Sequence, residues 1–327
     1  MRDAGAATDC VIALDVGGTN MKGAVLDRAL RPLRTTRRPT PCRAGPDTVV
    51  TAIVATLREL YDAADARGAT VHGVGVVVPG IVDEKSQMAV YSANLGWRDL
   101  PLTDRLTPAL GLPVVLGHDV RAGGTAESRI GAARGTGDAL FLAIGTGISA
   151  AVFIDGHPVR AGGYGGELGH LTVEPDGKPC VCGGRGCLET IASAAAIAAD
   201  YTARTNRRVD GAAAVAALLR AGDCDAQAVW GRAVDALAVA LATVGAILAP
   251  ELVVLGGGLA QADKLLLDPL RDRLAGRLTF QRRPSLVRAA LGDQAGCLGA
   301  GLLAWQRAHE PVAELHEQAD GTRRWAL

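Results

Sequence analysis

The sequence is poor in the features that mark several large classes of protein. Aromatic side chains make up 3% of its 327 residues, which argues against a surface that stacks nucleic-acid bases on aromatic rings. Lys plus Arg and Asp plus Glu both number 34, so the net charge is zero and bulk charge favours no polyanionic partner. The first ten residues lack the apolar core of a signal peptide, and the longest apolar run, 236–250, is only about 15 residues long. We therefore expect a cytoplasmic protein that binds neither nucleic acid nor a membrane.

The cysteines are not arranged as in a disulfide-rich secreted protein. There are 7 of them, an odd number, and Cys180, Cys182 and Cys187 lie close together. With His170 upstream, these residues supply three thiolates and an imidazole, a ligand set typical of tetrahedral Zn2+ sites. The alternative is three buried or redox-active thiols, although a disulfide between Cys180 and Cys182 would be strained. We interpret the four residues as a structural zinc site.

Two carboxylates, Glu167 and Glu189, lie in the same stretch. A histidine that binds zinc through one ring nitrogen offers the other nitrogen to an acceptor. If that acceptor is a substrate hydroxyl, the metal holds a binding side chain in place. Glu167, close to His170 in the sequence, could then contact the same ligand. The residues alone therefore suggest a zinc-supported site for a polyol.

A pattern of strand, Gly/Thr turn and strand occurs twice. The two copies are 11–14, Gly17-Gly18-Thr19 and 21–27, and 139–144, Gly145-Thr146-Gly147 and 148–154. Glycines let backbone N–H groups approach a phosphate, and each threonine adds a hydroxyl donor. No Gly-Lys-Ser/Thr leads from either turn into a helix, so neither is a Walker A loop. Ordinary glycine-rich turns are the alternative. The repetition predicts a duplicated α/β fold whose halves face each other across a nucleotide.

Other predicted strands also end in residues that suit ligands. Asp15 ends the first strand and could hold Mg2+ or its water. Gly80 follows an apolar strand at 71–78, and ligands of open α/β sheets gather at such strand ends. Asp119 lies between a strand and a helix, where an Asp is either a helix cap or a catalytic carboxylate. Gly256, Gly257 and Gly258 follow a strand and precede a predicted helix at 259–273.

The remaining periodicity predicts further elements. The predicted helices are 47–67, 101–110, 121–130, 193–219 with a break near 205–210, 225–248 and 296–307, and the last strand is 285–290.

In this order, the motifs resemble those of the ROK family (repressors, open reading frames and sugar kinases). DVGGTN at 15–20 and AIGTGISAA at 143–151 look like its phosphate motifs, and LGGGL at 255–259 like its adenosine motif. GELGH at 166–170 and CVCGGRGCLE at 180–189 look like its sugar and zinc signature. The resemblance implies an α/β, actin-like ATPase (ribonuclease H-like) duplicated fold with two lobes and a central cleft. It also implies a small lobe at 1–118, with a helix at 299–327 packing back on it, and a large lobe at 119–298 that carries the zinc.

What the resemblance implies for function is phosphorylation of a hexose by ATP with Mg2+, with glucose expected to give glucose 6-phosphate, in a homodimer or homotetramer. Asp119 matches the family's general base. The substrate-binding matches are Gly80, Asn94, His118, Asp119, Glu167, His170 and Glu189. The nucleotide-binding matches are Asp15, Gly17, Gly18, Thr19, Asn20, Lys22, Gly145, Thr146, Gly147, Gly256, Gly257 and Gly258. The zinc matches are His170, Cys180, Cys182 and Cys187.

One position departs from the family pattern. Kinases of the family often have Asn before the catalytic Asp, where it contacts the sugar, and His118 stands there in this chain. This leaves open a kinase for N-acetylmannosamine, N-acetylglucosamine or fructose, and also a sugar-binding regulator without catalysis. Only 14 residues precede Asp15, too few for the helix-turn-helix of a repressor, so we do not expect one. Whether polyphosphate replaces ATP does not follow from the sequence.

Overall fold

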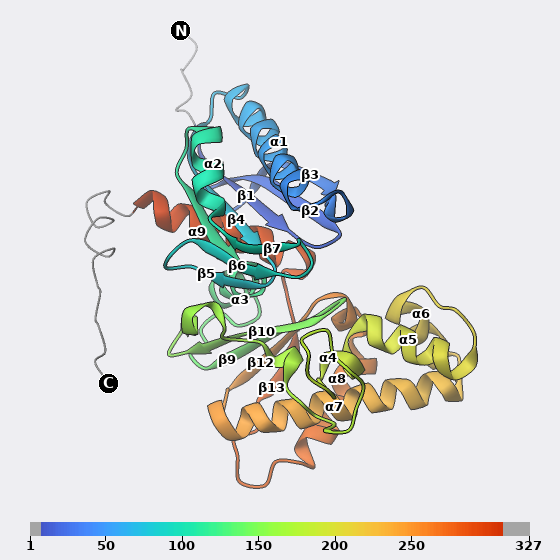
Figure 1. Cartoon of the computed structure of the whole chain (residues 1–327). Coiled ribbons are helices and arrows are strands. Elements are labelled where there is room, and N and C mark those ends of the chain that lie inside the picture. The colour runs from blue at the N-terminus through green and yellow to red at the C-terminus, as the bar shows by residue number, and fades with distance from the viewer. Residues whose placement is uncertain (1–7, 310–327) are drawn as a thin grey trace, which may run out of the picture. The chain divides into compact units, whose positions relative to one another are not determined.

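The computed structural model describes residues 8–309, which form two compact units. Among the described residues, unit 1 contains those up to 80, 87–117 and those from 300 onward. Unit 2 contains 81–86 and 118–299. Figure 1 colours the chain from blue at the N-terminus to red at the C-terminus, so unit 1 is recognised by its blue strands.

The sheet of unit 1 has the order β3-β2-β1-β4-β8. Its strands are β1 (Asp9–Val16), β2 (Asn20–Asp27), β3 (Pro32–Pro39), β4 (Thr70–Val78) and β8 (Val114–His118). The first three strands pair antiparallel, and β4 pairs parallel with β1. The apolar runs of β1 and β4 are buried almost throughout, as expected for strands covered on both faces. The predicted hairpin-like turn between the first two strands is confirmed.

Three helices and a hairpin complete unit 1. They are α1 (Pro46–Asp65), α2 (Leu102–Leu110), the later part of α9 (Ala295–His309), and the hairpin of β6 (Met88–Ser92) and β7 (Trp97–Leu100). Gly75 allows α9 to approach β4 closely, because a Cβ there would lie 1.9 Å from the carbonyl oxygen of Ala300. Trp305 donates its indole N–H to the carbonyl of Asp27 at 3.2 Å. The part of the predicted C-terminal helix beyond residue 309 lies outside the described residues.

The sheet of unit 2 has the order β11-β10-β9-β12-β13, which repeats the arrangement of unit 1. Its strands are β9 (Ala139–Ile144), β10 (Ile148–Ile154), β11 (His157–Pro158), β12 (Leu252–Gly256) and β13 (Ser285–Arg288). Again three strands in sequence pair antiparallel, and the fourth pairs parallel with the first. The predicted duplication is therefore confirmed at the level of sheet topology.

Unit 2 also contains the short strand β5 (Ile81–Asp83) and several helices. The helices are α3 (Asp119–Ile130), α4 (Glu189–Ala192), α5 (Ala194–Thr205), α6 (Gly211–Arg220), α7 (Cys224–Leu248) and α8 (Lys264–Ala275). The helix α7 is long and apolar enough to cross a membrane by length and composition alone. It belongs to the hydrophobic core of the unit, however, where Trp230, Leu237 and Leu241 are buried.

Two of the predicted boundaries differ from the structure. The helix predicted at 259–273 is wrong at its start, because a 3-10 turn, Gly258–Ala262, comes first and α8 begins only at Lys264. The hairpin of β6 and β7 was not predicted, since its strands are short and their apolar residues do not alternate regularly. The predicted break near 205–210 is confirmed by the gap between α5 and α6.

Candidate active site

The first phosphate turn joins β1 to β2 in unit 1. The N–H of Gly17 donates to the carbonyl of Asn20 at 3.0 Å, which closes the turn. Thr40 fixes it from the side, because its hydroxyl donates to the carbonyl of Gly17 at 2.6 Å. Thr19 and Gly18 are exposed, so their N–H and hydroxyl groups can meet a ligand. Asp15 stands opposite Lys22 in the β1–β2 register, and both are predicted nucleotide ligands.

Asn94, the predicted sugar ligand of unit 1, lies next to this turn. A Cβ added to Gly18 would be 3.4 Å from the Cβ of Asn94, and Asn94 itself is exposed in the turn between β6 and β7. Gly80 has φ of 109°, and a Cβ there would lie 2.2 Å from the carbonyl oxygen of Tyr91. Gly80 is therefore required by the backbone packing of this hairpin.

The second phosphate turn joins β9 to β10 in unit 2 and is bound by Glu189. Its Oε2 accepts the N–H of Ile148 at 2.7 Å. A Cβ on Gly147 would lie 2.4 Å from the same oxygen, so glycine is needed there for the carboxylate to approach. The carbonyl of Gly145 accepts the N–H of Ala194 at 2.8 Å, which ties the turn to α5. Thr146 is exposed at its tip.

The third glycine-rich turn follows β12 and lies against the end of β9. Gly257 has φ of 78°, and a Cβ there would lie 2.4 Å from the carbonyl oxygen of Ile144. Gly257 and Gly258 are exposed, whereas Gly256 is buried against the ring of Phe141. The structure thus brings the third turn next to the strand that leads into the second.

Asp119 begins α3, and the preceding residue is the cap of that helix. The ring nitrogen Nδ1 of His118 accepts the N–H of Arg121 at 3.2 Å, so the proton of a neutral ring is on Nε2. That nitrogen lies 3.5 Å from Oδ1 of Asp119, which also accepts the N–H of Val120 at 2.7 Å. Burial lowers the pKa of His118, although the Asp119 and Glu84 carboxylates oppose the shift. Both ring nitrogens therefore face partners inside the protein, and only 3% of the side chain is exposed.

The hydrogen bonds of the described residues reach only one oxygen of the Asp119 carboxylate. Oδ2 is left to accept a proton, and 24% of the side chain is exposed. Asp119 is therefore both at the helix N-terminus, as expected of a cap, and open to a ligand, as expected of a base.

The sequence did not suggest Arg121, although it is the most buried cation of the site. Its guanidinium reaches one carboxylate, that of Glu84 at 3.0 Å, and three backbone carbonyls of unit 2. Glu84 uses its second oxygen to accept from Arg160 at 2.6 Å. Burial alone would raise the pKa of Glu84, but Arg121 and Arg160 outweigh it and the pKa is lowered. These partners are far apart in the chain, so no local motif could have indicated them.

The environment of Glu167 brings the predicted sugar ligands of unit 2 together. Burial raises the pKa of this carboxyl, and the charges that act on it are those of His170, Arg121, Asp119 and Glu189. Charges from three segments, 119–121, 167–170 and 189, thus act on one half-buried carboxyl. Such an arrangement of a perturbed acid with several polar groups is typical of a functional site.

The four predicted zinc ligands form one cluster. Their ligand atoms all lie within 4.8 Å of one another. Zn–S bonds of about 2.3 Å and a Zn–N bond of about 2.05 Å place two sulfurs about 3.8 Å apart, and sulfur and nitrogen about 3.6 Å apart, in a tetrahedron. The observed separations are 3.7 Å for the sulfurs of Cys182 and Cys187, and 3.6 Å from the Cys180 sulfur to His170 Nδ1. The cluster therefore has the size of a tetrahedral zinc site, and His170 is left with Nε2.

The charges of the cluster also suit a cation. Burial raises the pKa of Cys187 to about 12, and hydrogen bonds with Cys182 and Cys180 act in the same direction. A thiolate at that position needs a nearby positive charge, which a metal ion supplies. The loop that carries the ligands turns at Gly183, with φ of 90°, and the N–H of Cys180 donates to the carbonyl of Gly184 at 2.9 Å.

A family model described as ROK family matches residues 11–307. The chain belongs to the ROK family. The glucokinase of Thermotoga maritima is 33% identical over 314 residues, which cover 91% of this chain and 98% of that protein. The N-acetylmannosamine kinase of Salmonella typhi is 32% identical over 300 residues, covering 90% and 97%. A solved ROK family glucokinase from Streptomyces griseus, in complex with glucose and AMPPNP, is 31% identical with a TM-score of 0.77, covering 91% and 99%. The fold is the actin-like ATPase fold of two lobes, as predicted.

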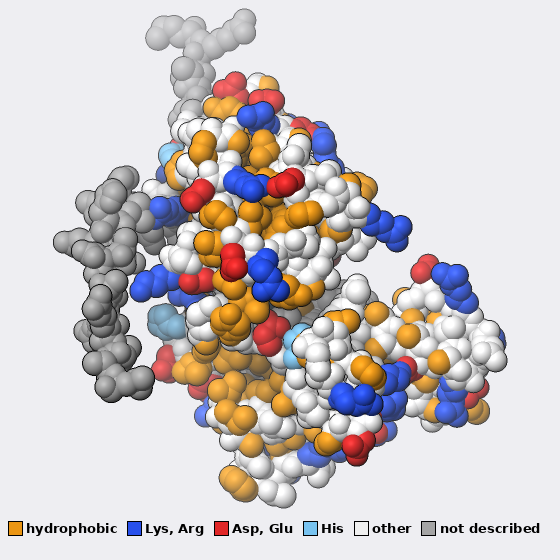
Figure 2. Space-filling view, viewed as in Figure 1, with side chains coloured by type: hydrophobic (Ala, Val, Ile, Leu, Met, Phe, Trp, Pro, Cys, Tyr) orange, Lys and Arg blue, Asp and Glu red, His pale blue; other side chains and the backbone are white. Residues whose placement is uncertain are grey.

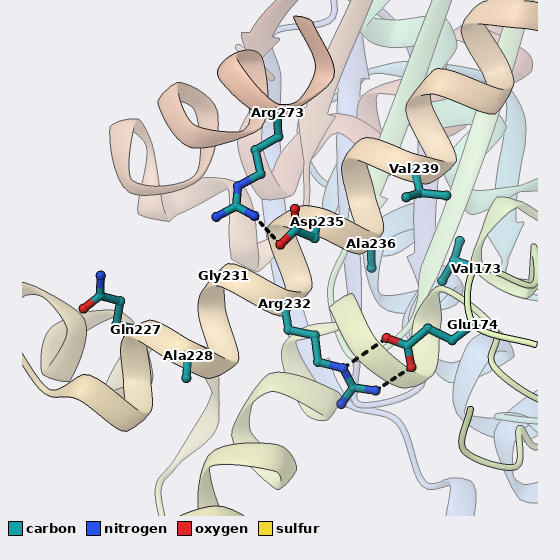
Figure 3. Close-up of a pocket in the computed structure, with 10 residues that line it drawn as sticks. All are labelled: Val173, Glu174, Gln227, Ala228, Gly231, Arg232, Asp235, Ala236, Val239 and Arg273. Atoms are coloured by element: carbon teal, nitrogen blue, oxygen red, sulfur yellow. Dashed lines mark hydrogen bonds and ion pairs between the residues drawn. The ribbon is translucent and has the colours of Figure 1, made fainter. Parts of the chain in front are cut away.

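A groove of about 660 Å3 runs along α7 (Figure 3). It is lined by Val173, Glu174, Gln227, Ala228, Gly231, Arg232, Asp235, Ala236, Val239 and Arg273. Its charges neutralise each other, because Arg232 pairs with Glu174 and Arg273 pairs with Asp235. None of the predicted ligands lines it. Basic and acidic side chains are also interspersed on the face drawn in Figure 2, in keeping with the zero net charge.

Proposed function

We propose that this ROK family protein is an ATP-dependent hexose kinase that converts glucose to glucose 6-phosphate. The observation that carries the proposal is that hydrogen bonds join the segments of unit 2 that carry Asp119, Glu167, His170 and Glu189. Arg121 donates to the carbonyl of Gly165, the N–H of Ala150 donates to the carbonyl of Gly166, and Glu189 accepts the N–H of Ile148. A base with one free oxygen thus lies in the same environment as three groups that suit sugar hydroxyls. The glucokinases among the relatives support glucose as the acceptor.

In the proposed reaction, Oδ2 of Asp119 accepts the proton of the attacking hydroxyl. General-base assistance of this kind typically contributes about 10²–10⁴-fold to the rate. The exposed N–H groups of the three glycine-rich turns, with Thr19 and Thr146, would bind the phosphates and the nucleoside. Asp15 would orient the Mg2+ that accompanies ATP, and Asn20 and Lys22 would complete that part of the site. Most of the remaining acceleration in such a transfer comes from positioning and from neutralising charge on the phosphates.

We also propose that His170, Cys180, Cys182 and Cys187 hold a structural Zn2+. The metal would fix the ring of His170 through Nδ1, so that Nε2 and the carboxylates of Glu167 and Glu189 can bind sugar hydroxyls. Asn94 and Gly80 are the proposed contribution of unit 1 to sugar binding. His118 is proposed to act through Asp119, because its ring nitrogens face internal partners.

Three coarser expectations complete the proposal. The two lobes would be 1–118 with 299–327, and 119–298. The protein would work in the cytoplasm, and the long apolar helix α7 belongs to the core of unit 2. It would form a homodimer or homotetramer.

A second candidate function is phosphorylation of N-acetylmannosamine, and one observation supports it. His118 stands where kinases of the family often carry a sugar-contacting Asn, so the sugar contacts of this chain differ at that place. N-acetylglucosamine and fructose are further candidate substrates, and the same experiment tests them.

The experiment is ADP release from Mg-ATP over a panel of hexoses, with the Asp119→Asn variant in parallel. We expect turnover on glucose and a loss of about 10²–10⁴-fold in kcat in the variant, with sugar binding retained. Turnover on an N-acetylated sugar or fructose instead would change the assigned substrate and leave the proposed role of Asp119 as the base unchanged. Sugar binding without turnover on any hexose would show a non-catalytic regulator.

A further inference from the structure

Arg121 has an unusual position for a charged residue. Only 2% of its side chain is exposed, and it leaves the first turn of α3 two residues after Asp119. Removing a guanidinium from water costs several kcal/mol unless its donors are satisfied. Here they are satisfied, because Nε donates to Glu84 at 3.0 Å and Nη2 donates to the carbonyl of Val82 at 2.9 Å.

The remaining donors of Arg121 reach the glycine-rich loop before Glu167. Nη1 donates to the carbonyls of Gly163 and Gly165, at 3.4 Å and 3.3 Å. Gly163 has φ of 95°, and a Cβ there would lie 2.5 Å from the carbonyl oxygen of Val82. The loop is therefore pressed against β5, and the same guanidinium holds carbonyls on both sides of that contact.

Glu84 fixes the guanidinium in turn. One of its oxygens accepts from Arg121 and the other accepts from Arg160, which precedes the loop. The pair is thus part of a network that joins the segment at 82–84, the helix α3 and the loop at 160–165. Such networks fix one geometry when all their members are satisfied.

A purely structural role is the alternative, and Glu127 provides the comparison. This residue lies on the same helix, is fully buried, and accepts N–H groups of Ala132, Ala290 and Leu291 at 2.7–3.2 Å. Glu127 therefore links α3 to the segments at 132 and 290–291, and it makes no hydrogen bond to the loop at 160–165. Arg121 differs because two of its partners, the carbonyls of Gly163 and Gly165, lie just before Glu167, one of the proposed sugar ligands.

We propose that Arg121, held by Glu84, is a positioning residue that fixes the 163–165 loop, and so Glu167, relative to the base Asp119. The proposal rests on the proposed kinase function, and it assigns the network to sugar orientation. A planar fork with five donors is suited to several carbonyls at once, and lysine cannot replace it.

The test compares Arg121→Lys, Arg121→Ala and Glu84→Gln with Glu127→Gln as the matched control. For the Arg121 and Glu84 variants we expect kcat/KM for the sugar to fall about 100-fold with KM for ATP unchanged, since small misplacements near the chemistry cost that much. Added guanidinium ion should restore part of the activity of Arg121→Ala. Glu127→Gln should lower the thermal stability and leave the kinetics of the folded enzyme unchanged.

Hydrogen exchange without any sugar separates this inference from the proposed function. Faster exchange at 162–168 in the Arg121 variants, with the zinc loop unchanged, supports the positioning of the loop even if no hexose is turned over. If an Arg121 variant does not fold, the sugar kinetics and the hydrogen exchange of the loop are measured on Glu84→Gln instead. Unchanged exchange of the loop, or variants that lose stability with wild-type kinetics as Glu127→Gln does, would overturn the proposal.

Discussion

The carboxyl of Glu167 combines two conflicting demands. Its pKa is raised because burial disfavours the charged form, and Asp119 and Glu189 add negative charge nearby. To bind a sugar, however, Glu167 is needed as a carboxylate, which accepts a hydrogen bond from a sugar hydroxyl. The folded protein thus raises the pKa of a carboxyl that sugar binding would use in its charged form, and perturbed pKa values of this kind are common at functional sites.

Glu167→Gln should therefore stabilise the protein and weaken sugar binding. Because the folded-state pKa is raised, the folded protein binds this proton more tightly than the unfolded chain does. The destabilising effect of the anion is present above the folded-state pKa and disappears as the pH falls through it. We expect a higher melting temperature for the variant at neutral pH, a difference that shrinks in acid, and a sugar KM raised about tenfold or more by the lost charged hydrogen bond. Melting curves from neutral to acid pH and sugar kinetics measure both. A variant less stable than the parent at neutral pH would contradict the argument.

Two glycines of one turn make a second test at this scale. A Cβ on Gly147 would lie 2.4 Å from Oε2 of Glu189, whereas one on Gly145 would meet nothing within 4 Å. Gly147→Ala should therefore displace the carboxylate from the N–H of Ile148, and the loss of a hydrogen bond to a charged group costs about 1.5–3 kcal/mol. Gly145→Ala should leave the stability unchanged. Thermal unfolding compares the stabilities of the two variants. Equal melting temperatures would show that Glu189 moves without a loss of stability.

At the scale of elements, the zinc loop is stabilised by its ligands more than by secondary structure. Between Thr172 and Cys187 the structure has two isolated β-bridges and no helix or strand. A segment with so little regular structure depends on the metal for its order.

Removing one ligand should therefore disorder the loop and weaken the sugar site together. We expect about one zinc per chain in the purified protein, and loss of that zinc in Cys182→Ser. The variant should show a raised sugar KM with little change in KM for ATP, because His170 loses its orientation. Cys224→Ser is the matched control, since Cys224 is exposed and lies outside the cluster. Metal analysis and kinetics measure the outcome, and full sugar affinity in a zinc-free protein would refute the role of the metal.

The zinc ligands and the network of Arg121 differ in how far the sequence could predict them. Cys180, Cys182 and Cys187 are close in sequence, so their chemistry and spacing indicated one cluster. Arg121 and Glu84 are 37 residues apart, and Arg160 is 76 residues from Glu84. Nothing local tells such a buried arginine from an exposed one. The 3-10 turn before α8 was missed for a similar reason, because it depends on the approach of Gly257 to Ile144.

At the scale of the whole molecule, the two units share one topology and place their phosphate turns alike. The first turn joins the first two strands of its sheet, and the second turn joins the matching strands of the other sheet. The third turn follows β12, the parallel neighbour of β9. A duplicated fold thus offers exposed backbone N–H groups at equivalent places in each unit. Most of the proposed sugar ligands, among them His170, Glu167 and Glu189, belong instead to unit 2.

Hydrogen exchange over the whole chain should therefore distinguish the two ligands. AMPPNP with Mg2+ should slow exchange at 17–20 in unit 1 and at 145–147 and 256–258 in unit 2, since bound ligand stabilises the segments that it contacts. Glucose should slow exchange mainly at 118–121 and 162–170. At 100 times its dissociation constant, a ligand stabilises the native state by about 2.7 kcal/mol, which is large enough to detect as slower opening. Asp119→Asn should keep both patterns, because it removes the base and leaves the binding groups in place. If AMPPNP protected only the turns of unit 2, the assignment of Gly17, Gly18 and Thr19 to phosphate binding would be wrong. The assignment of the sugar site would not be affected.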